Sequence, residues 1–215
     1  MPDLERESAA ASAAIFEADG LACRRGGRLL LDAVDWRLAP GDALLLKGAN
    51  GSGKSSLLRL LAGFLRPAAG CLRHGGSDVF TDLPHWRCLL HLVGYQDALK
   101  PSLTVAENVA TVSTLLGGTA ARLATALDRF GLAELADTPA RFLSSGQRRR
   151  VGLARLVAVP RPIWLLDEPA TGLDAKNRGR LEALLDEHRA AGGIAVVASH
   201  GDVALERPHV LDLGD

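Results

Sequence analysis

The chain has no excess of charge of either sign, because its 215 residues include 25 Lys and Arg and 25 Asp and Glu. Proteins that bind nucleic acid or anionic lipid through surface charge are normally basic, so this balance argues against both kinds of partner. Long apolar runs are also missing. The runs at residues 29–31, 43–46 and 194–198 are far shorter than the roughly 20 residues that a membrane-spanning helix needs. The sequence therefore predicts a chain without a membrane span and without a nucleic-acid partner.

Features of secreted proteins are missing as well. The cysteines are Cys23, Cys71 and Cys88, and no two of them have the spacing of a metal site. Scattered cysteines in odd number are typical of ordinary thiols in a reducing compartment. Acidic residues at positions 3, 5 and 7 stand where a secretory signal carries basic ones. We therefore interpret residues 1–14 as a flexible leader and residues 15–215 as a single domain.

What the sequence does contain is the composition of a folded domain, with 47% hydrophobic and 23% charged residues. Strand patterns alternate with helix patterns, which favours an α/β fold. Residues 34–38 alternate between apolar and polar, as in a half-buried antiparallel strand. Apolar strands covered on both faces, as in a parallel sheet, are expected at 42–47, 163–166 and 194–198. A further strand is expected at 15–21, helices at 55–62 and 181–189, and a helical insertion at 104–136.

The strongest motif is a glycine-rich loop between an expected strand and an expected helix. Residues 48–55 match the pattern G-x-x-x-x-G-K-[ST] in full. The glycines let backbone N–H groups turn inward around an anion, and the following helix adds its positive N-terminal end. Lys54 supplies a full charge for the β- and γ-phosphates, and Ser55 a hydroxyl for Mg²⁺. We expect the nucleotide phosphates to be held by Gly48, Ala49, Asn50, Gly51, Ser52, Gly53, Lys54, Ser55 and Ser56.

A second motif is the apolar run at 163–166 that ends in Asp167 and Glu168. Carboxylates at the carboxyl end of a buried strand lie where ligands bind in open α/β sheets. Asp167 is placed to hold Mg²⁺, and Glu168 to polarise the water that attacks the γ-phosphate. The plain alternative is a strand that ends in solvated acids, and the phosphate loop upstream makes that reading the weaker one.

A third pattern, Leu-Ser-Ser-Gly-Gln at residues 143–147, completes a resemblance to the ATP-binding-cassette (ABC) ATPases. Residues 48–55 resemble the family's Walker A loop, Gln96 its Q-loop, 143–147 its signature, 163–168 its Walker B strand, 171–174 its D-loop and His200 its switch histidine. Each motif is weak alone, but the set in this order is highly specific and covers nearly the whole chain. The family usually has glycine where Ser145 stands. Ser144 and Gly146 are retained, so we expect activity to survive.

The resemblance implies a P-loop NTPase fold: an ABC ATPase cassette with a RecA-like core, an antiparallel β subdomain and an α-helical subdomain at about residues 97–158. It also implies a homodimer in which ATP lies between the Walker A loop of one copy and the signature of the other. The catalytic residues would be Glu168, His200, Gln96 and Lys54, and the Mg²⁺ ligands Ser55, Gln96 and Asp167. Ser144, Gly146, Gln147 and Asp174 would complete the partner's nucleotide site.

Two points remain open in the sequence. Many family members stack an aromatic residue on adenine after the first strand. In this chain the candidate for that role is Arg25, whose planar guanidinium could stack on the base. Phe16 is the alternative, and we favour a place for it in the core. The run of arginines at 148–150 is either an anion patch or the start of a helix whose arginines face solvent or acids of a partner domain. We favour the second reading.

Within the ABC ATPases, the tracts at 94–108, 147–156 and 164–169 resemble the ATP-binding subunits of haem exporters in cytochrome c maturation. That resemblance implies ATP-driven haem export or release, integral permease subunits in separate chains, and a place at the cytoplasmic face of the bacterial inner membrane. We expect no direct haem binding, because no Cys-x-x-Cys-His occurs and His74, His85 and His91 are isolated. The alternatives are the ATPase of another ABC exporter, a soluble ABC ATPase with no membrane partner, and a nucleotide-binding regulator that does not hydrolyse ATP.

Overall fold

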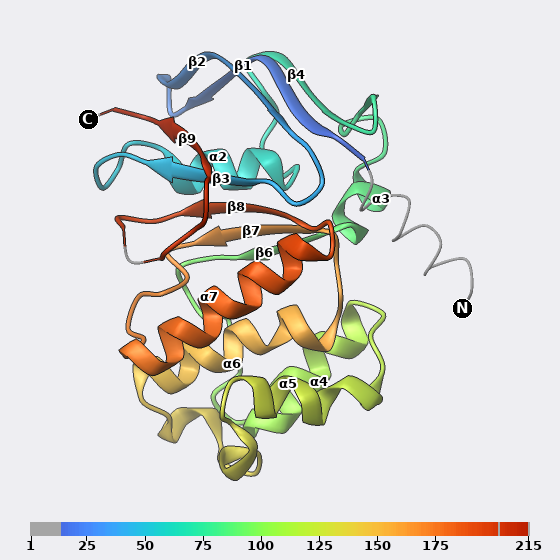
Figure 1. The fold of residues 1–215 in the computed structure, drawn as a ribbon, viewed down its shortest axis with the longest axis vertical. Helices are drawn as coiled ribbons and strands as arrows, with labels where there is room; N and C mark the ends of the chain where they lie inside the picture. Colours follow the sequence, from blue (N-terminus) through green and yellow to red (C-terminus); the bar gives the residue numbers. More distant parts are fainter. Residues whose placement is uncertain (1–13, 202, 215) are drawn as a thin grey trace.

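The computed structural model describes residues 14–201 and 203–214, except the side chains of Arg25 and Arg28. The leader expected at residues 1–14 therefore lies, apart from Ala14, outside the described residues. The chain folds into two sheets and a group of helices arranged in layers (Figure 1). Within the described residues, no helix combines the length and apolar character needed to cross a bilayer.

The first sheet is antiparallel, with the strand order β2-β1-β4-β5. Its strands are β1 (Phe16–Arg25), β2 (Arg28–Leu38), β4 (Ala69–His74) and β5 (Ser77–Asp78). The expected antiparallel pairing near the start of the chain is confirmed, since Phe16 lies opposite Leu38 and Ala18 opposite Trp36. Phe16 is fully buried and packs against Trp36 and Trp86, so it belongs to the core and not to a nucleotide site.

The second sheet is parallel, with the strand order β6-β7-β8-β3-β9. Its strands are β3 (Ala43–Lys47), β6 (Leu90–Val93), β7 (Ile163–Asp167), β8 (Ile194–Ala198) and β9 (His209–Asp212). All residues of β7 and β8 are buried, as the apolar runs at 163–166 and 194–198 predict, and Asp167 at the end of β7 is buried with them. Asp167 pairs with Ala198, which in turn is level with Leu46, so the ends of three strands meet at one edge.

One helix fills the space between the two sheets. Helix α2 (Lys54–Leu61) contacts β1 on one side and β7 and β8 on the other (Figure 1). Its buried leucines form one apolar cluster with Phe16, Trp86 and the side chains on the face of the parallel sheet that α2 covers. Helix α3 (Leu83–Cys88) contributes Trp86 to the same cluster. This packing fixes the N-terminal end of α2 at the edge of the parallel sheet where the functional motifs lie.

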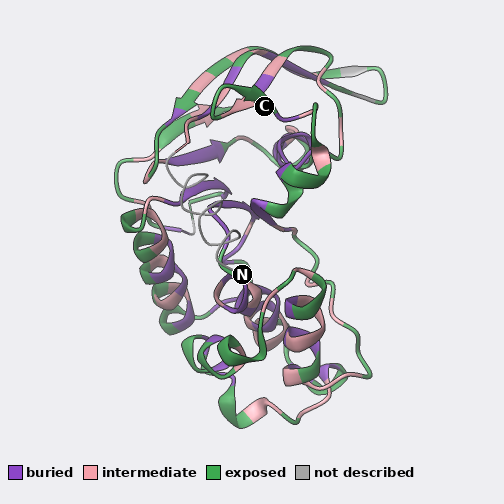
Figure 2. Cartoon of the chain, turned by 90° about the vertical axis from the view of Figure 1, so that its right-hand side faces the viewer, coloured by how far each residue is buried: buried purple, intermediate pink, exposed green. Residues whose placement is uncertain are grey.

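The remaining helices lie on the other side of the parallel sheet, and two of them, at residues 145–158 and 175–190, contact it directly. They are α4 (Val105–Leu115), α5 (Leu123–Arg129), α6 (Ser145–Ala158) and α7 (Ala175–Ala190), joined in part by short 3₁₀ turns at Ala120–Arg122, Ala133–Leu135 and Ala140–Phe142. Figure 2 shows that buried residues lie on the inward sides of these helices while their outer sides are exposed. The helical insertion expected at 104–136 thus folds as α4, α5 and two of the 3₁₀ turns.

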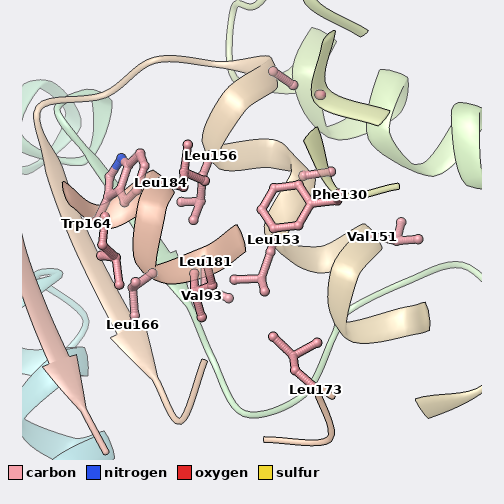
Figure 3. Packing of buried hydrophobic residues seen from close by; sticks show 14 of the residues in the cluster. Val93, Phe130, Val151, Leu153, Leu156, Trp164, Leu166, Leu173, Leu181 and Leu184 are labelled. Atoms are coloured by element: carbon pink, nitrogen blue, oxygen red, sulfur yellow. The ribbon is translucent and has the colours of Figure 1, made fainter. Parts of the chain in front are cut away.

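A second apolar cluster ties these helices to the sheet. Trp164 and Leu166 of β7 pack with Leu181 and Leu184 of α7, and with leucines of α6 (Figure 3). Phe130, at the end of α5, extends the cluster further from the sheet. Because α6 lies in the middle of this cluster, its N-terminal end is held in a defined place relative to β7.

Candidate functional site

The loop between β3 and α2 has the backbone that its glycines predict. Gly48, Gly51 and Gly53 all have positive φ, at 136°, 88° and 110°. A Cβ on Gly48 would lie 2.6 Å from Ser52 Oγ and 3.0 Å from Gly214 O, so only glycine fits there. Gly53 caps α2 without any side-chain hydrogen bond, which leaves the first amides of the helix available to an anion. The buried Ser52 Oγ has no hydrogen-bond partner in the described part of the chain.

Lys54 lies inside this loop. Its side chain is buried, and its Nζ donates hydrogen bonds to Gly48 O at 2.6 Å and to Ala49 O at 3.0 Å. Nζ is also 3.4 Å from His200 Nε2. The ammonium group is therefore held by neutral carbonyl oxygens and has no carboxylate partner among the ion pairs of the described residues. A polyphosphate could take over its charge without breaking an existing salt bridge.

The loop forms one wall of a cavity of about 540 Å³ at the carboxyl edge of the parallel sheet. The two acids at the end of β7, Asp167 and Glu168, also line it. The lining residues are Leu30, Asn50, Gly51, Gly53, Lys54, Ser55, Ser56, Tyr95, Asp167 and Glu168. Sequence reasoning did not select Leu30 or Tyr95. Leu30 lines the cavity because its side chain packs 3.2 Å from the position that a Cβ of Gly53 would take.

Glu168 has an unusual backbone. Its φ of 47° is in the left-handed region, which a residue with a Cβ rarely adopts. Its N–H donates to Ala198 O at 2.9 Å, which fixes the turn after β7 against the neighbouring strand. Burial raises the pKa of the Glu168 carboxyl, and the charges of His200 and Lys54 oppose that rise. A carboxylate with a raised pKa is a better proton acceptor, which suits a general base.

His200 follows β8 and contacts both the glycine-rich loop and Glu168. Its Nε2 is 2.7 Å from Asn50 Oδ1 in the glycine-rich loop and 3.4 Å from Glu168 Oε1. Lys54, Glu168 and His200 come from three separate segments of the chain and meet within hydrogen-bonding or ion-pair distance. The sequence predicted all three as site residues, and the structure brings them together.

Asp167 and Ser55 are placed where a divalent cation would need oxygen ligands. Both line the cavity, Asp167 from the end of β7 and Ser55 from the first turn of α2. Oxygen donors are the set that Mg²⁺ prefers. Within the described residues, no group of three or more His, Cys, Asp or Glu could hold a metal by itself. Gln96 lies exposed in the loop after β6 and is not among the lining residues.

The signature segment begins helix α6. Ser144 caps the helix in a reciprocal pair with Gln147: the Gln147 N–H donates to Ser144 Oγ at 3.2 Å, and the Ser144 N–H donates to Gln147 Oε1 at 2.7 Å. Ser145 occupies the first turn with no positive φ in the described backbone, so serine fits where the ABC family usually has glycine. Ser144 and Ser145 are exposed.

The signature packs against the segment that leads into α7. A Cβ on Gly146 would lie 2.7 Å from Gly172 O, so the glycine permits a close approach of the two backbones. Asp174 caps α7, and its Oδ1 accepts hydrogen bonds from the Asn177 N–H at 2.8 Å and from Asn177 Nδ2 at 2.9 Å. The backbone hydrogen bond from Asn177 is the main cause that lowers the pKa of Asp174. Among the described residues that line the cavity there is none from the signature or from 171–174.

Three residues predicted from the sequence need comment, because two lie in other surroundings than expected and the side chain of the third is outside the described structure. The arginines at 148–150 were expected to face outward, but Arg149 is only 3% exposed and donates hydrogen bonds to carbonyl oxygens inside the protein. His91 was interpreted as an isolated residue of a polar segment and is instead buried in β6, with Nε2 2.7 Å from Val159 O. Arg25, the candidate for adenine stacking, ends β1, and its side chain lies outside the described part of the structure.

Comparison with known proteins agrees with this geometry. The profile of the ABC transporter family matches residues 31–171. A Rhodospirillum rubrum protein named cytochrome c biogenesis ATP-binding export protein CcmA is 52% identical over 200 residues, which cover 93% of this chain and 86% of that protein. A protein of the same name from Paramagnetospirillum magneticum is 48% identical over 202 residues, covering 92% and 93%.

Solved structures share the fold at lower sequence identity. A putative ABC transporter ATP-binding protein from Pyrococcus furiosus superposes with a TM-score of 0.80 at 20% identity, covering 93% of this chain and 97% of that one. A structure described as the ATP-binding subunit of an ABC transporter gives a TM-score of 0.78 at 23% identity, covering 86% and 80%. The family match, the relatives and the cavity together show that the chain belongs to the ABC transporter family of ATP-binding proteins, as an ABC-type ATPase.

Proposed function

We propose that this chain is the ATP-hydrolysing subunit of an exporter for c-type cytochrome biogenesis, and that it drives the export or release of haem. The observation that carries the ATPase assignment is the position of His200, whose Nε2 lies 3.4 Å from both Lys54 Nζ and Glu168 Oε1, two groups that line one cavity. The export role is supported by relatives near 50% identity that are named as cytochrome c biogenesis export proteins.

ATP would bind with its phosphates in the loop at 48–55. The glycine backbone and the N-terminal end of α2 receive the phosphate oxygens, and the Lys54 ammonium exchanges the carbonyls of Gly48 and Ala49 for the β- and γ-phosphates. Glu168 accepts a proton from water as the water oxygen bonds to the γ-phosphorus. The bond between that phosphorus and the β–γ bridging oxygen breaks, which yields ADP and inorganic phosphate. His200 orients Glu168 and contacts the γ-phosphate.

Mg²⁺ would be held by Ser55 and Asp167, with Gln96 completing the set from the loop after β6. The fit rests on the oxygen donors that line the cavity beside the phosphate loop. When bound, the cation supplies positive charge that offsets the charge of the phosphate oxygens. Gln96 is exposed next to Tyr95, which lines the cavity, so its side chain would turn toward the cavity when nucleotide and cation bind.

Each nucleotide site would be completed by a second copy of the chain. The exposed Ser144, with Gly146 and Gln147, stands apart from the cavity of its own chain, and so does Asp174. In a head-to-tail homodimer these residues face the phosphates bound by the partner. ATP then joins the two copies, and hydrolysis removes the γ-phosphate that both copies contact.

The proposed partners are integral membrane permease subunits in separate chains, at the cytoplasmic face of the bacterial inner membrane. The test is to purify the tagged chain from membranes and to measure phosphate release by the complex. We expect integral exporter subunits in the complex and ATP-dependent phosphate release. The variant Lys54→Ala should keep the partners and lose ATP binding and turnover.

The outcomes separate the alternatives. A chain that hydrolyses ATP but brings no integral protein with it would be a soluble ABC ATPase. If the complex released phosphate but contained permeases of another pathway, the role in haem export would be contradicted and the ATPase role would stand. A complex that binds ATP without releasing phosphate would contradict the enzymatic role.

A further inference from the structure

Arg149 connects three parts of the candidate site from inside the protein. Its guanidinium donates from Nε to Pro169 O at 3.1 Å, and from Nη2 to the carbonyl oxygens of Asp167 and Glu168, both at 2.8 Å. Nη1 donates to Gly94 O at 2.8 Å and contacts Asp97 Oδ1 at 3.3 Å. One side chain of α6 thereby holds three consecutive carbonyls at the end of β7 and contacts the loop after β6 on both sides of Gln96.

The shape of the guanidinium explains why arginine suits this place. Its donors lie in one plane in a fixed fork, so they can bind several carbonyl oxygens in set directions at once. A lysine would keep the charge but would present its N–H groups from a single nitrogen. The bonds to Asp167 and Glu168 flank the residue whose φ of 47° is unfavourable without outside support.

The neighbouring arginine provides a natural comparison. Arg150 also donates to two carbonyl oxygens, Phe130 O at 2.8 Å and Gly131 O at 2.9 Å. These acceptors follow the end of α5 in the helical layer, where Figure 3 shows Phe130, and neither of them is among the residues that line the cavity. Two adjacent residues of α6 thus make the same kind of contact, and only Arg149 makes it with the backbone of Asp167 and Glu168.

We propose that Arg149 is a positioning residue for ATP hydrolysis. It fixes the backbone of Glu168 and the loop around Gln96 relative to α6, the helix that Ser144 caps. The proposal rests on the proposed function, since it takes Glu168 as the group that accepts a proton from water. Among the partners to which Arg149 donates hydrogen bonds, only Asp167 and Glu168 line the cavity, and both accept through their backbone carbonyls. The loss of Arg149 should therefore affect turnover more than nucleotide binding.

The first test compares Arg149→Met and Arg149→Lys with the control Arg150→Met. For each variant, the ATP dissociation constant is measured by fluorescence titration and kcat by phosphate release. We expect Arg149→Met to lower kcat about 10- to 100-fold while the dissociation constant changes less than about threefold, as for other residues that orient a catalytic group. Arg149→Lys should recover part of that loss. Arg150→Met should keep kcat within about threefold of the parent.

The proposal would be overturned if Arg149→Met kept parental kcat, or if Arg150→Met lost as much turnover as Arg149→Met. Should Arg149→Met fail to fold, Arg149→Lys decides the matter: parental kcat contradicts the proposal, and a lowered kcat with unchanged ATP affinity supports it.

A second readout does not depend on turnover. Hydrogen–deuterium exchange should quicken in Arg149→Met at the amides of residues 163–173 and 94–97, and Arg150→Met should leave both segments at parental rates. Parental exchange rates in Arg149→Met would contradict the proposal that Arg149 holds these two segments in place. A parent chain that releases no phosphate would instead contradict the proposed function, and the exchange experiment would still test Arg149.

Discussion

At the scale of single residues, Glu168 combines two unfavourable features that its proposed role explains. Its backbone has a positive φ, and its carboxyl group is buried enough to raise its pKa. Both features lower the stability of the folded state when the carboxyl is ionised. Both also place a basic oxygen next to the phosphate loop. Such exchanges of stability for reactivity are common at catalytic sites.

The variant Glu168→Gln should bind ATP and fail to hydrolyse it. The amide keeps the shape of the side chain but cannot accept a proton from water, so phosphate release should fall at least about 100-fold. Phosphate release and ATP binding are measured on the same preparation. Turnover at the parental rate would contradict the role of Glu168 as the general base.

The same variant should be more stable than the parent at neutral pH. Because folding raises the pKa of this carboxyl above its ordinary 4.5, its contribution to stability is fully present below pH 4.5 and is lost as pH rises through the folded pKa. Glutamine does not ionise and so avoids the loss. Each kcal/mol gained in the free energy of unfolding should raise Tm by about 2–4 °C. The Tm difference should be present at pH 7 and vanish near pH 4, and a difference independent of pH would contradict this cause.

Sequence reasoning found Lys54, Glu168 and His200 because each belongs to a motif whose chemistry demands that residue type. It missed the role of Arg149. A run of three arginines does not reveal which guanidinium turns inward, since that depends on how α6 packs against β7 and the loop after β6. Arg25 remains the candidate for adenine stacking.

At the scale of elements, the contact between α6 and the segment before α7 depends on Gly146. In Gly146→Ala the new Cβ would lie 2.7 Å from Gly172 O, and because the acceptor is backbone, one of the two segments must move. We expect a loss of about 1–3 kcal/mol in the free energy of unfolding and a lowered kcat.

The matched control is Gly179→Ala in α7, where a Cβ would meet no atom within 4 Å. It should stabilise the chain by about 0.5–1 kcal/mol through helix propensity, with kcat unchanged. Denaturant unfolding and phosphate release measure both effects. Equal stability of Gly146→Ala and the parent would contradict the close contact between the two segments.

Strand β6 carries a histidine that should make the fold sensitive to acid. Burial lowers the pKa of His91 to about 3, although the contact with Val159 O opposes that shift. The unfolded chain binds a proton near pH 6.5 and the folded chain does not, so stability falls by about 1.4 kcal/mol per pH unit below that value. The parent should lose about 2 kcal/mol from this residue between pH 7 and pH 5.

The variant His91→Gln tests this account because its amide can still donate to Val159 O but does not titrate. Urea unfolding at pH 7 and pH 5 should show a smaller loss of stability in the variant than in the parent. An equal loss in both proteins would show that other groups cause the acid sensitivity.

Sequence patterns located the strands that are apolar runs, and missed several strands of mixed apolar and polar sequence. Strands β3, β7 and β8 were predicted because each is an apolar run buried on both faces. Strand β6 interrupts its apolar run with His91, and β9 is an edge strand with mostly exposed residues. Such segments become strands through pairing with a neighbour, which a local pattern does not encode.

At the scale of the whole molecule, the layered fold separates the two halves of the proposed nucleotide site. The phosphate loop, Asp167, Glu168 and His200 gather at the carboxyl edge of the parallel sheet, and the signature caps a helix of the adjoining layer (Figure 1). The shared apolar cluster holds these layers together. The α/β class followed from the sequence pattern, whereas the pairing of two copies came from the family resemblance.

The central claim is that ATP lies between the phosphate loop of one copy and Ser144 of the other. Sedimentation velocity of Glu168→Gln with and without Mg-ATP tests it directly, using two further changes at Ser144 that both preserve the helix cap. Ser144→Asn is neutral, and Ser144→Asp places a negative charge against the partner's phosphates. With ATP bound, we expect dimers of Glu168→Gln and of its Ser144→Asn form, and monomers of its Ser144→Asp form. Dimers of the Ser144→Asp form, or ATP-bound monomers of Glu168→Gln, would contradict the account.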